Sequence, residues 1–388
     1  MQRVGVRLKA RAEQQYEIIV GDGLLSTLGE EARRCLPQSA RRVALISNEK
    51  VFSLYGETAR KSLRRASLAP VPWLMKDGER HKNLRTLERA LEFLSLSGLE
   101  RSDAVIALGG GVVGDLAGFA AAVYLRGIPF LQVPTTLLAQ VDASVGGKTA
   151  VNLIAGKNMA GAFHQPRAVL IDTRTLSTLP RRELTAGWCE AVKQGAVGNR
   201  HLFDQTYDYL SGAGQKISTA DTHLEELIAA QCAFKAGIVR GDEREEMTRS
   251  DGRSRRILNF GHTTAHALEK VTGYRRFRHG EAVGYGMIVA GELSVGLGLL
   301  DPSELELLRS AVRLCGRLPR ASDLDEGMIL DALSHDKKRV GGHLKWVLLE
   351  RLGRATIVDQ SEIAPRLLRA SLRAAFDGRV AANSRARK

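Results

Sequence analysis

The sequence predicts an α/β N-terminal domain built on a Rossmann-like parallel sheet, followed by a mostly α-helical C-terminal domain. The chain has 388 residues, more than one compact core usually holds, so two domains are expected. In the first half, runs rich in β-branched residues alternate with helical stretches, which is typical of a parallel sheet with crossover helices. From Glu183 onward, apolar residues recur mostly every three or four positions, as they do in helices.

The strands of the first half are expected where β-branched and other apolar residues cluster, at RRVALISN, PVPWLM, DAVIALGGG, PFLQVPTT and RAVLIDT. Helices are expected after Val51, near Leu84–Leu96 and at Asp115–Tyr124. The N-terminal stretch MQRVGVRLKARAEQQYEIIVG alternates apolar with polar residues, so it is interpreted as a strand and not as a signal sequence.

The Pro and Arg cluster in TLPRREL ends this alternation, and we place the domain boundary there. Residues 1–182 are expected to form the first domain and residues 183–375 the second, in which KWVLLER is the main strand-like exception. Residues 376–388 are small and basic, and they are expected to form a disordered tail.

The composition predicts a soluble globular protein of a reducing compartment. Hydrophobic residues make up 44% and charged residues 26%, and no apolar run reaches the roughly 18 to 20 residues of a membrane helix. The 4 cysteines are far apart and form no CxxC pair, so neither a disulfide framework nor a thiolate metal site is predicted. A cytoplasmic location without a membrane partner is therefore expected.

The formal net charge of +14 has two interpretations, a nucleic-acid-binding face or an active site that attracts an anionic metabolite. Lys and Arg are scattered along the chain, and most of their denser clusters have no stacking aromatic residues beside them. This pattern favours a small anionic substrate and predicts no nucleic-acid partner.

A glycine-rich loop follows the strand predicted at DAVIALGGG. Gly109, Gly111 and Gly114 satisfy GxGxxG at the start of a helix, where backbone amides can face a pyrophosphate. A tight strand-to-helix turn that needs glycine only for packing is the alternative. No acidic residue lies about 20 positions further on, so any dinucleotide must be held differently from the common fingerprint, and Lys82 could supply a phosphate contact.

A second glycine and lysine cluster reads VDASVGGKTAVN. The first glycine of a GxxxxGKT loop would stand where this chain has Asp142, which disfavours a kinase or NTPase. Lys148, Lys157 and Asn158, with Arg126 upstream, can instead neutralise phosphate and carboxylate groups. Solvated surface lysines remain the alternative.

The stretch GHTTAHALE places His262 and His266 on one helical face, and His279 follows a short loop. Neighbouring imidazoles suggest a divalent metal, although hydrogen-bonded core histidines are the commoner outcome. Glu190 could add a carboxylate ligand, or it could form a simple helix ion pair with Lys193. Two nitrogens and one carboxylate would leave a coordination position open for catalysis.

Several segments together resemble the 3-dehydroquinate synthase family in order and spacing, over about residues 1–360. They are GGGVVGDLAGFAAAVYLRGIPFLQVPTTLLAQVDASVGGKTAVN, GKNMAGAFHQP, TLPRREL, GWCEAVKQG, GHTTAHALE and RHGEAVGYG. Other sugar-phosphate cyclases and the polyol dehydrogenases of this fold differ around VDASVGGKTAVN. The chain departs from the family pattern at Ala265 and Cys189 and has a longer basic loop, EEMTRSDGRSRR, so the register of Arg255 against Arg256 stays open.

The resemblance implies a dehydroquinate synthase-like fold whose first domain binds NAD and whose second binds metal and substrate. The metal, Zn²⁺ or Co²⁺, would be held by Glu190, His262 and His279, while His266 would contact substrate. The implied NAD-binding residues are Asn48, Asp77, Gly78, Glu79, Lys82, Gly111, Gly114, Asp115, Thr135, Thr136, Lys148, Lys157, Thr175 and Thr178. The implied substrate-binding and catalytic residues are Arg126, Asp142, Lys148, Asn158, Lys193, Lys235, Arg255 and His266.

The implied reaction converts 3-deoxy-D-arabino-heptulosonate 7-phosphate into 3-dehydroquinate and phosphate, with NAD returned unchanged, in the shikimate pathway of aromatic amino acid biosynthesis. A homodimer is also implied. Three alternatives remain: a cyclase acting on sedoheptulose 7-phosphate, a metal-dependent polyol dehydrogenase that releases NADH, and a basic nucleic-acid-binding protein on a retired enzyme fold.

Overall fold

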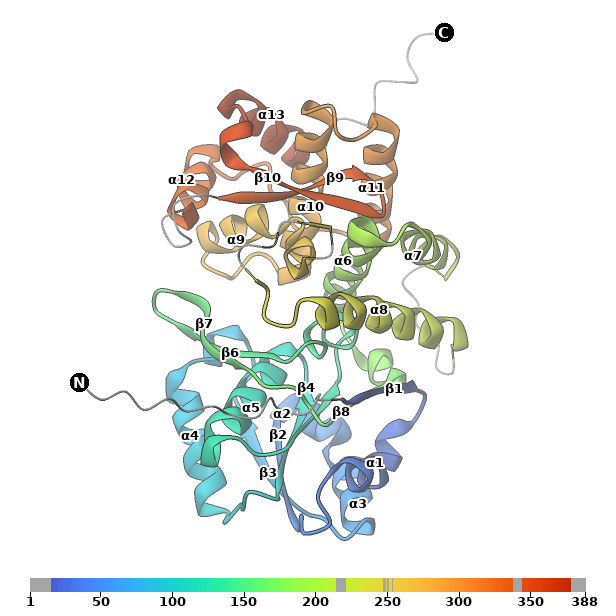
Figure 1. The fold of residues 1–388 in the computed structure, drawn as a ribbon, viewed down its shortest axis with the longest axis vertical. Coiled ribbons are helices and arrows are strands. Elements are labelled where there is room, and N and C mark those ends of the chain that lie inside the picture. The colour runs from blue at the N-terminus through green and yellow to red at the C-terminus, as the bar shows by residue number, and fades with distance from the viewer. Residues whose placement is uncertain are drawn as a thin grey trace, which may run out of the picture.

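The computed structural model describes residues 15–213, 221–246, 249, 251–252, 254–337 and 344–377. The part of the predicted N-terminal strand before residue 15, and residues 378–388 of the predicted tail, lie outside the described residues. The two halves of the chain are stacked along the long axis of the molecule, with the sheet in one half and most helices in the other (Figure 1). Within the described part, no helix is long and apolar enough to cross a membrane.

The first half is organised around a 6-stranded sheet with the order β1-β8-β5-β4-β2-β3. Every pairing between these strands is parallel, which confirms the predicted parallel sheet and the strands predicted for it. The strands are β1 (Glu17–Gly21), β2 (Arg42–Asn48), β3 (Ala69–Met75), β4 (Ala104–Gly109), β5 (Phe130–Pro134) and β8 (Ala168–Asp172).

Helices cover both faces of this sheet. Val43 and Leu45 of β2 pack with α1 (Leu28–Cys35) and α3 (Glu57–Arg65), whereas Ala44 and Ile46 pack with α4 (Leu84–Leu96) and α5 (Gly111–Val123). Successive side chains of a strand point to opposite faces, so a strand covered on both sides must be apolar throughout. This requirement explains why the strands appear in the sequence as continuous apolar runs.

Two features of the first half differ from the prediction. Helix α5 begins at Gly111 and not at Asp115, because the glycine-rich turn itself enters the helix. An antiparallel hairpin of β6 (Lys148–Leu153) and β7 (Gly156–Phe163), which was not predicted, projects from the sheet half toward the helical half (Figure 1). Its sequence is rich in small and polar residues, which gave no strand signal.

The second half is mostly helical, as predicted. Helix α10 lies at its centre and packs against α6, α9, α11 and α13. The predicted strand KWVLLER is present as β9, and it pairs with β10, which was not predicted. The elements are α6 (Arg181–Gly198), α7 (Arg200–Ala213), α8 (Thr222–Gly241), α9 (His262–Val271), α10 (His279–Gly296), α11 (Pro302–Cys315), α12 (Glu326–Lys337), β9 (Lys345–Arg351), β10 (Arg354–Asp359) and α13 (Pro365–Phe376).

Short helical turns connect these elements and place several polar side chains between the two halves. They are η1 (Leu24–Thr27), α2 (Glu49–Val51), η2 (Phe52–Gly56), η3 (Glu79–His81), η4 (Tyr124–Arg126), η5 (Ala139–Ala143), η6 (Thr173–Thr178), η7 (Arg255–Asn259) and η8 (Gln360–Glu362).

The two halves share a core. Leu137, Val141 and Ile171 from the first half are buried in the same apolar cluster as Trp188 and Val192 of α6. The predicted boundary between residues 182 and 183 falls in the first turn of α6 and stays a prediction. Phe376, which the sequence analysis placed in the tail, is the last residue of α13.

Candidate active site

Glu190, His262 and His279 lie together where three helices meet. Glu190 is in the middle of α6, His262 is the first residue of α9, and His279 is the first residue of α10. One ligand atom from each residue lies within 4.8 Å of the other two. The structure thus brings together the three residues that the resemblance implies as metal ligands. The ring of His266 lies beside them, with its centroid 5.6 Å from that of His262.

Glycines allow the three helices to approach this closely. A Cβ added to Gly280 would lie 1.9 Å from the carbonyl oxygen of Ala186, and one added to Gly286 would lie 1.9 Å from that of Gly261. Gly261, which precedes His262, has a left-handed φ of 78° that other residues rarely adopt. The helices are in contact through backbone atoms at these glycines. Glu190, His262 and His279 can therefore lie close together.

The surroundings of Glu190 fit a bound divalent metal. Its side chain is buried, and within the described part of the chain neither carboxylate oxygen accepts a well-formed hydrogen bond. Lys193 Nζ lies 2.5 Å from Oε2 as an ion pair, and His279 Nε2 lies 3.6 Å from Oε1. Buried carboxylate oxygens normally have such partners, and a metal ion would supply one. Two imidazole nitrogens and a carboxylate are a donor set of catalytic zinc, and this set leaves one position open.

The contacts of His262 leave Nε2 as the nitrogen that could coordinate a metal. Its Nδ1 lies 3.2 Å from the carbonyl oxygen of Phe260. Burial lowers the pKa of His262 well below its ordinary value, and the charges of Lys193 and His279 lower it further. The ring is therefore neutral, and when Nδ1–H donates to the carbonyl, the lone pair of Nε2 is free for a metal.

His279 has a carboxylate partner that the sequence analysis missed. Its Nδ1 lies 3.5 Å from Glu269 Oε1, and the same oxygen is 2.8 Å from Lys157 Nζ. Burial lowers the pKa of His279, but Glu269 outweighs this effect and leaves it raised. Burial raises the pKa of Glu269, but His279 and Lys157 outweigh it and bring it to about 2. Nothing in the sequence indicated this contact except that an acid lies on the helix that carries His262.

Alternating charges extend from the metal ligands into the space between the halves. Lys193 Nζ is 3.8 Å from Asp142 Oδ1, and Lys235 Nζ is 2.8 Å from the same atom. Burial raises the pKa of Asp142, but the two lysines outweigh it and leave it lowered. Burial lowers the pKa of Lys235, whereas Glu190 and Asp142 outweigh burial at Lys193 and raise its pKa. The predicted residues Asp142, Lys193 and Lys235 therefore form one network with Glu190.

Arg255 lies at the other end of this network. Its guanidinium is buried and donates to the carbonyl oxygens of Gly146, at 3.0 Å, and Glu243, at 2.6 Å. Burial lowers its pKa. The guanidinium thereby lies beside the segment that leads to Lys148. The amine of Lys148 is paired with Glu245. In this structure Arg255 makes the contact with that segment, through the carbonyl oxygen of Gly146.

Most residues implied for NAD lie at one edge of the sheet, whereas Lys148 and Lys157 lie on the hairpin of β6 and β7. Asn48 ends β2, Asp77 to Lys82 follow β3, Gly111 to Asp115 follow β4, and Thr135 and Thr136 follow β5; the turn with Thr175 and Thr178 follows β8. The carboxyl ends of parallel strands meet at the same edge, where ligands of such sheets bind. The structure therefore brings these segments together.

Close packing shapes the glycine loop. A Cβ on Gly110 would lie 2.9 Å from Thr136 Cγ2, and one on Gly114 would lie 2.9 Å from Gln132 Oε1. The N-cap residue of α5, Gly110, makes no side-chain cap, so the amides of the first turn can face an anion. Thr135 Oγ1 is buried and has no hydrogen-bond partner within the described residues, as expected of a group that awaits a ligand.

Lys82 is the centre of a second network. Its buried amine lies 2.7 Å from Asp115 Oδ2, 2.7 Å from Asn158 Oδ1 and 3.2 Å from Glu79 Oε1. Asn158 has a left-handed φ of 54°, which turns its side chain toward this network. A phosphate that binds Lys82, as predicted, would therefore share its amine with the carboxylates of Glu79 and Asp115.

The remaining predicted residues are placed as follows. Asn48 Nδ2 donates to Asp77 Oδ1 at 3.3 Å, Thr175 Oγ1 donates to Asp172 O at 2.7 Å, and Thr178 Oγ1 bonds to the hydroxyl of Tyr55. Gly78 has a φ of 99° in the turn before Glu79. Arg126 is exposed at the end of η4 with a φ of 67°, and within the described residues no ion pair joins it to the networks above.

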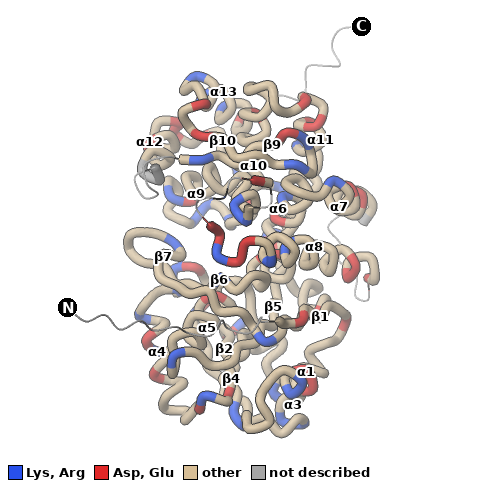
Figure 2. The backbone as a smooth tube through the Cα atoms, viewed as in Figure 1, with Lys and Arg blue, Asp and Glu red and all other residues tan. Residues whose placement is uncertain are grey.

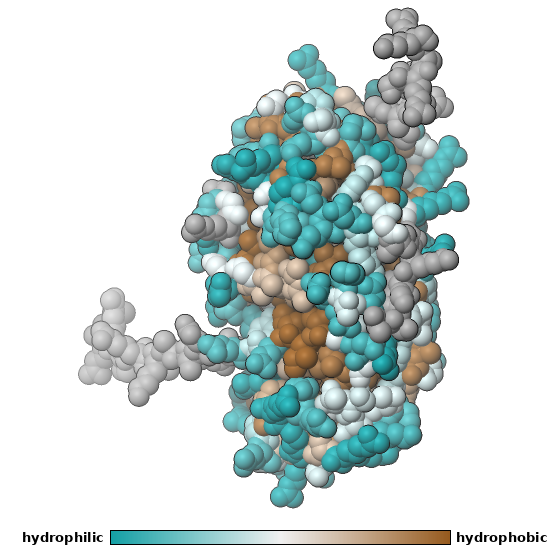
Figure 3. Space-filling view, turned by 90° about the vertical axis from the view of Figure 1, so that its right-hand side faces the viewer, coloured by the Kyte–Doolittle hydropathy of each residue, from teal (hydrophilic) through white to brown (hydrophobic). Residues whose placement is uncertain are grey.

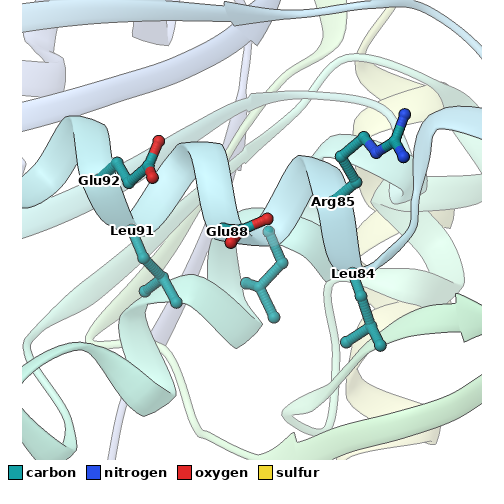
Figure 4. A pocket seen from close by; sticks show the side chains of 6 residues that line it. Leu84, Arg85, Glu88, Leu91 and Glu92 are labelled. Carbon is teal, nitrogen blue, oxygen red and sulfur yellow. The ribbon is translucent and has the colours of Figure 1, made fainter.

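A shallow depression on α4 is separate from this site (Figure 4). It is lined by residues of a single helix, and none of the predicted site residues contributes to it. Its lining residues are Leu84, Arg85, Leu87, Glu88, Leu91 and Glu92.

Two family descriptions match consecutive parts of the chain. Residues 72–186 match the family described as 3-dehydroquinate synthase N-terminal, and residues 187–339 match 3-dehydroquinate synthase C-terminal. A 3-dehydroquinate synthase of Pelotomaculum thermopropionicum is 45% identical over 363 residues, covering 92% of this chain and 93% of the relative.

Two solved structures of cyclases are similar over nearly the whole chain. The 2-epi-5-epi-valiolone synthase ValA of Streptomyces hygroscopicus, with NAD+ and Zn2+ bound, has 28% identity and a TM-score of 0.84, covering 96% of this chain and 99% of its own. A 2-deoxy-scyllo-inosose synthase complexed with carbaglucose-6-phosphate, NAD+ and Co2+ has 27% identity and a TM-score of 0.78, covering 92% and 96%. The chain described here belongs to the 3-dehydroquinate synthase family.

Proposed function

We propose that this protein is an NAD- and metal-dependent 3-dehydroquinate synthase. It converts 3-deoxy-D-arabino-heptulosonate 7-phosphate into 3-dehydroquinate and phosphate, a carbon–oxygen lyase reaction of the shikimate pathway. The observation that carries this proposal is the group of Glu190, His262 and His279 next to a network of buried cations, in a chain that belongs to this family.

Glu190, His262 and His279 are the residues proposed to hold Zn²⁺ or Co²⁺. The donor set and the unsatisfied carboxylate of Glu190 fit such an ion. When bound, the metal supplies a Lewis acid at the reacting hydroxyl and NAD supplies a hydride acceptor. The protein contributes a fixed arrangement of ligands, because three helices are locked together by close glycine contacts.

The dinucleotide is proposed to lie across the carboxyl edge of the sheet. There it would meet the amides that begin α5 and the buried hydroxyl of Thr135. Lys82 is the cation proposed for a phosphate, and Glu79 and Asp115 hold it in place. The full set is Asn48, Asp77, Gly78, Glu79, Lys82, Gly111, Gly114, Asp115, Thr135, Thr136, Lys148, Lys157, Thr175 and Thr178.

The substrate's phosphate and carboxylate are proposed to bind the cations between the halves. Lys148 is paired with Glu245 and Lys235 with Asp142. A doubly anionic substrate would compete for these lysines, and charge-assisted hydrogen bonds to it are stronger than neutral ones. The full set is Arg126, Asp142, Lys148, Asn158, Lys193, Lys235, Arg255 and His266.

Asp142 is placed to fix the protonation of its neighbours. It holds Lys235 at 2.8 Å, and it lies within 3.8 Å of Lys193, which also pairs with Glu190. With both lysines charged, the site stabilises negative charge that develops as phosphate leaves. Orientation of the substrate by this network would contribute more to ring closure than one acid or base.

The 3-dehydroquinate synthase activity is favoured over that of a sedoheptulose 7-phosphate cyclase. The curated 3-dehydroquinate synthase is 45% identical to this chain, whereas the solved 2-epi-5-epi-valiolone synthase is 28% identical over a similar length. The segment VDASVGGKTAVN, which contributes Asp142 and Lys148, is the part in which the resemblance to the dehydroquinate enzyme is specific.

A homodimer and a cytoplasmic location are further parts of the proposal. One side of the molecule has an apolar area surrounded by hydrophilic surface (Figure 3), and such areas often mark contacts between chains. Sedimentation of the purified protein at several concentrations tests the dimer.

The activity itself is tested by phosphate release from the heptulosonate phosphate, with 3-dehydroquinate identified as the organic product. The purified protein is assayed with NAD before chelation, after chelation and after zinc is restored. We expect release that chelation abolishes and zinc restores. If metal and NAD are bound but no phosphate is released, the substrate assignment is wrong.

A further inference from the structure

We propose that Glu269 and Lys157 form a clamp that positions the metal ligand His279 and joins the metal site to the dinucleotide side. The clamp connects α9 of the helical half with β7 of the hairpin. This inference rests on the metal site proposed above, but it concerns residues that do not contact the metal.

The ring of His279 lies between two carboxylates. Nδ1 is 3.5 Å from Glu269 Oε1, and Nε2 is 3.6 Å from Glu190 Oε1. A carboxylate on one nitrogen fixes the ring's orientation and tautomer and leaves the other nitrogen for the metal. The Glu269 side chain is only 3% exposed, so water does not readily take its place.

Lys157 holds the carboxylate of Glu269 in this position. Its amine is 2.8 Å from Glu269 Oε1 and lies over the ring of Tyr274, 4.7 Å from the centroid. The amide of Tyr274 donates to the carbonyl oxygen of Glu269 at 2.8 Å, so ring and carboxylate belong to one turn after α9. Lys157 is therefore held by two groups of the helical half.

Lys157 is adjacent to Asn158 in β7. Asn158 accepts a hydrogen bond of 2.7 Å from Lys82, which belongs to the network proposed for NAD. Adjacent residues of one strand thus reach different networks, as successive side chains of a strand point to opposite faces. A movement of the hairpin when NAD binds would be transmitted to Glu269 and then to His279.

Zinc affinity is the measurement that tests the clamp, and it does not depend on turnover. Metal-free protein is titrated with Zn²⁺ in competition with a chromophoric chelator, and the visible spectrum of the Co²⁺ form reports ligand geometry. Glu269→Ala removes the carboxylate, Glu269→Gln keeps an oxygen but removes the charge, and Lys157→Met removes the amine. Glu292→Gln is the matched control, because Glu292 pairs with Arg309 between α10 and α11 and contacts none of the three ligands.

We expect Glu269→Ala to weaken zinc binding by about 10- to 100-fold and to alter the Co²⁺ spectrum, with Glu269→Gln intermediate. Glu292→Gln should bind zinc as the wild type does. NAD should change the zinc affinity of the wild type by about fivefold or more, and Lys157→Met should reduce this coupling.

Several outcomes would overturn the clamp. Wild-type zinc affinity and an unchanged Co²⁺ spectrum in Glu269→Ala would refute the positioning role. Equal losses in Glu269→Ala and Glu292→Gln would assign Glu269 a merely structural role, and unchanged NAD coupling in Lys157→Met would refute the connection. A wild type that binds no zinc would instead refute the metal centre itself, and the clamp with it.

Discussion

Glu190 is the residue on which the electrostatics of the metal site depend. It is a buried carboxylate beside Lys193 and His279. Without it, Lys193 and His279 would each lose a buried carboxylate partner, which is costly. Asp142, 3.8 Å from Lys193, and Glu269, 3.5 Å from His279, would be the acids left beside them. A metal ion would then lose a ligand and also the charge that attracts it.

We expect Glu190→Ala to lose bound metal and activity together. The loss of Lewis-acid chemistry should lower kcat by about a thousandfold. Metal content after gel filtration and phosphate release by the same preparation are the measurements. A variant that keeps stoichiometric metal would contradict the proposed ligand role.

Lys148 should behave differently, because it lies on the substrate side. Its side chain is 48% exposed and pairs with Glu245, away from the ligand group. We expect Lys148→Ala to retain metal and to lower kcat/KM by about 10- to 100-fold, the value of a charge-assisted hydrogen bond. Lys148→Arg should recover part of this loss. Loss of metal in Lys148→Ala would show that its proposed role is wrong.

At the scale of single residues, the sequence predicts which residue types could bind a metal better than it predicts which residues are in contact. Spacing alone pointed to His262 and His266, whereas the compact ligand group contains His262 and His279. The resemblance implied the three residues that the structure brings together, since it carries information on tertiary neighbours, and their role as metal ligands stays a prediction. Glu269 could not be predicted, because its contact with His279 depends on how α9 packs against α10.

At the scale of elements, the site depends on helices that touch through their backbones. Gly286 of α10 faces the carbonyl of Gly261, the residue before His262. A methyl group there would force α9 and α10 apart. Overpacking of this kind costs about 1 to 3 kcal/mol, and here it would also move a ligand.

We therefore expect Gly286→Ala to lower the unfolding free energy by at least about 1 to 3 kcal/mol and to weaken zinc binding. Gly237 of α8 is the control, because within the described part of the chain an added Cβ would meet no atom within 4 Å apart from its neighbours and the backbone of its own helix. Gly237→Ala should raise stability by about 0.4 to 1 kcal/mol and leave zinc binding unchanged. Urea unfolding and zinc titration of both variants test this. Equal behaviour of the two variants would contradict the close-approach argument.

Asp242 fixes the junction between α8 and η7. Its carboxylate accepts hydrogen bonds from the amides of Glu246, at 2.9 Å, and Arg255, at 2.8 Å. Burial raises its pKa, but these bonds outweigh it and leave the pKa below the ordinary value of 3.8. A lowered pKa means that the carboxylate stabilises the fold above pH 3.8, and that this contribution is lost as the pH falls through the folded-state pKa.

We expect Asp242→Asn to lower the unfolding free energy by about 1 to 3 kcal/mol at pH 7, because a buried amide loses its acceptor. The difference from the wild type should shrink as the pH falls below 3.8. Urea unfolding of both proteins between pH 7 and pH 3 measures it. A difference that grows toward low pH would contradict the sign of the shift.

The elements themselves were predictable where burial dictates composition. Strands β2, β4, β5 and β8 are covered on both faces, so each appears as an apolar run. The hairpin of β6 and β7 is largely exposed in β7, where Met159 and Phe163 are among its few large apolar side chains. Such a hairpin is specified by its contacts with the rest of the fold more than by its own sequence.

At the scale of the whole molecule, two layers of polar residues face each other. The carboxyl edge of the sheet contributes the segments proposed for NAD, and the helical half contributes the metal ligands. In the view of Figure 2, Lys and Arg are spread over both halves of the molecule. This spread favours an anionic metabolite as the partner of the excess positive charge, and the absence of a nucleic-acid partner stays a prediction.

The measurement that tests the central claim most directly is the ratio of NADH formed to phosphate released during turnover of the heptulosonate phosphate. A cyclase returns its dinucleotide in each cycle, whereas the polyol dehydrogenases considered as an alternative release NADH. We expect many equivalents of phosphate and 3-dehydroquinate for each NAD bound, with no net NADH. NADH that accumulates in proportion to substrate consumed, without phosphate release, would contradict the account.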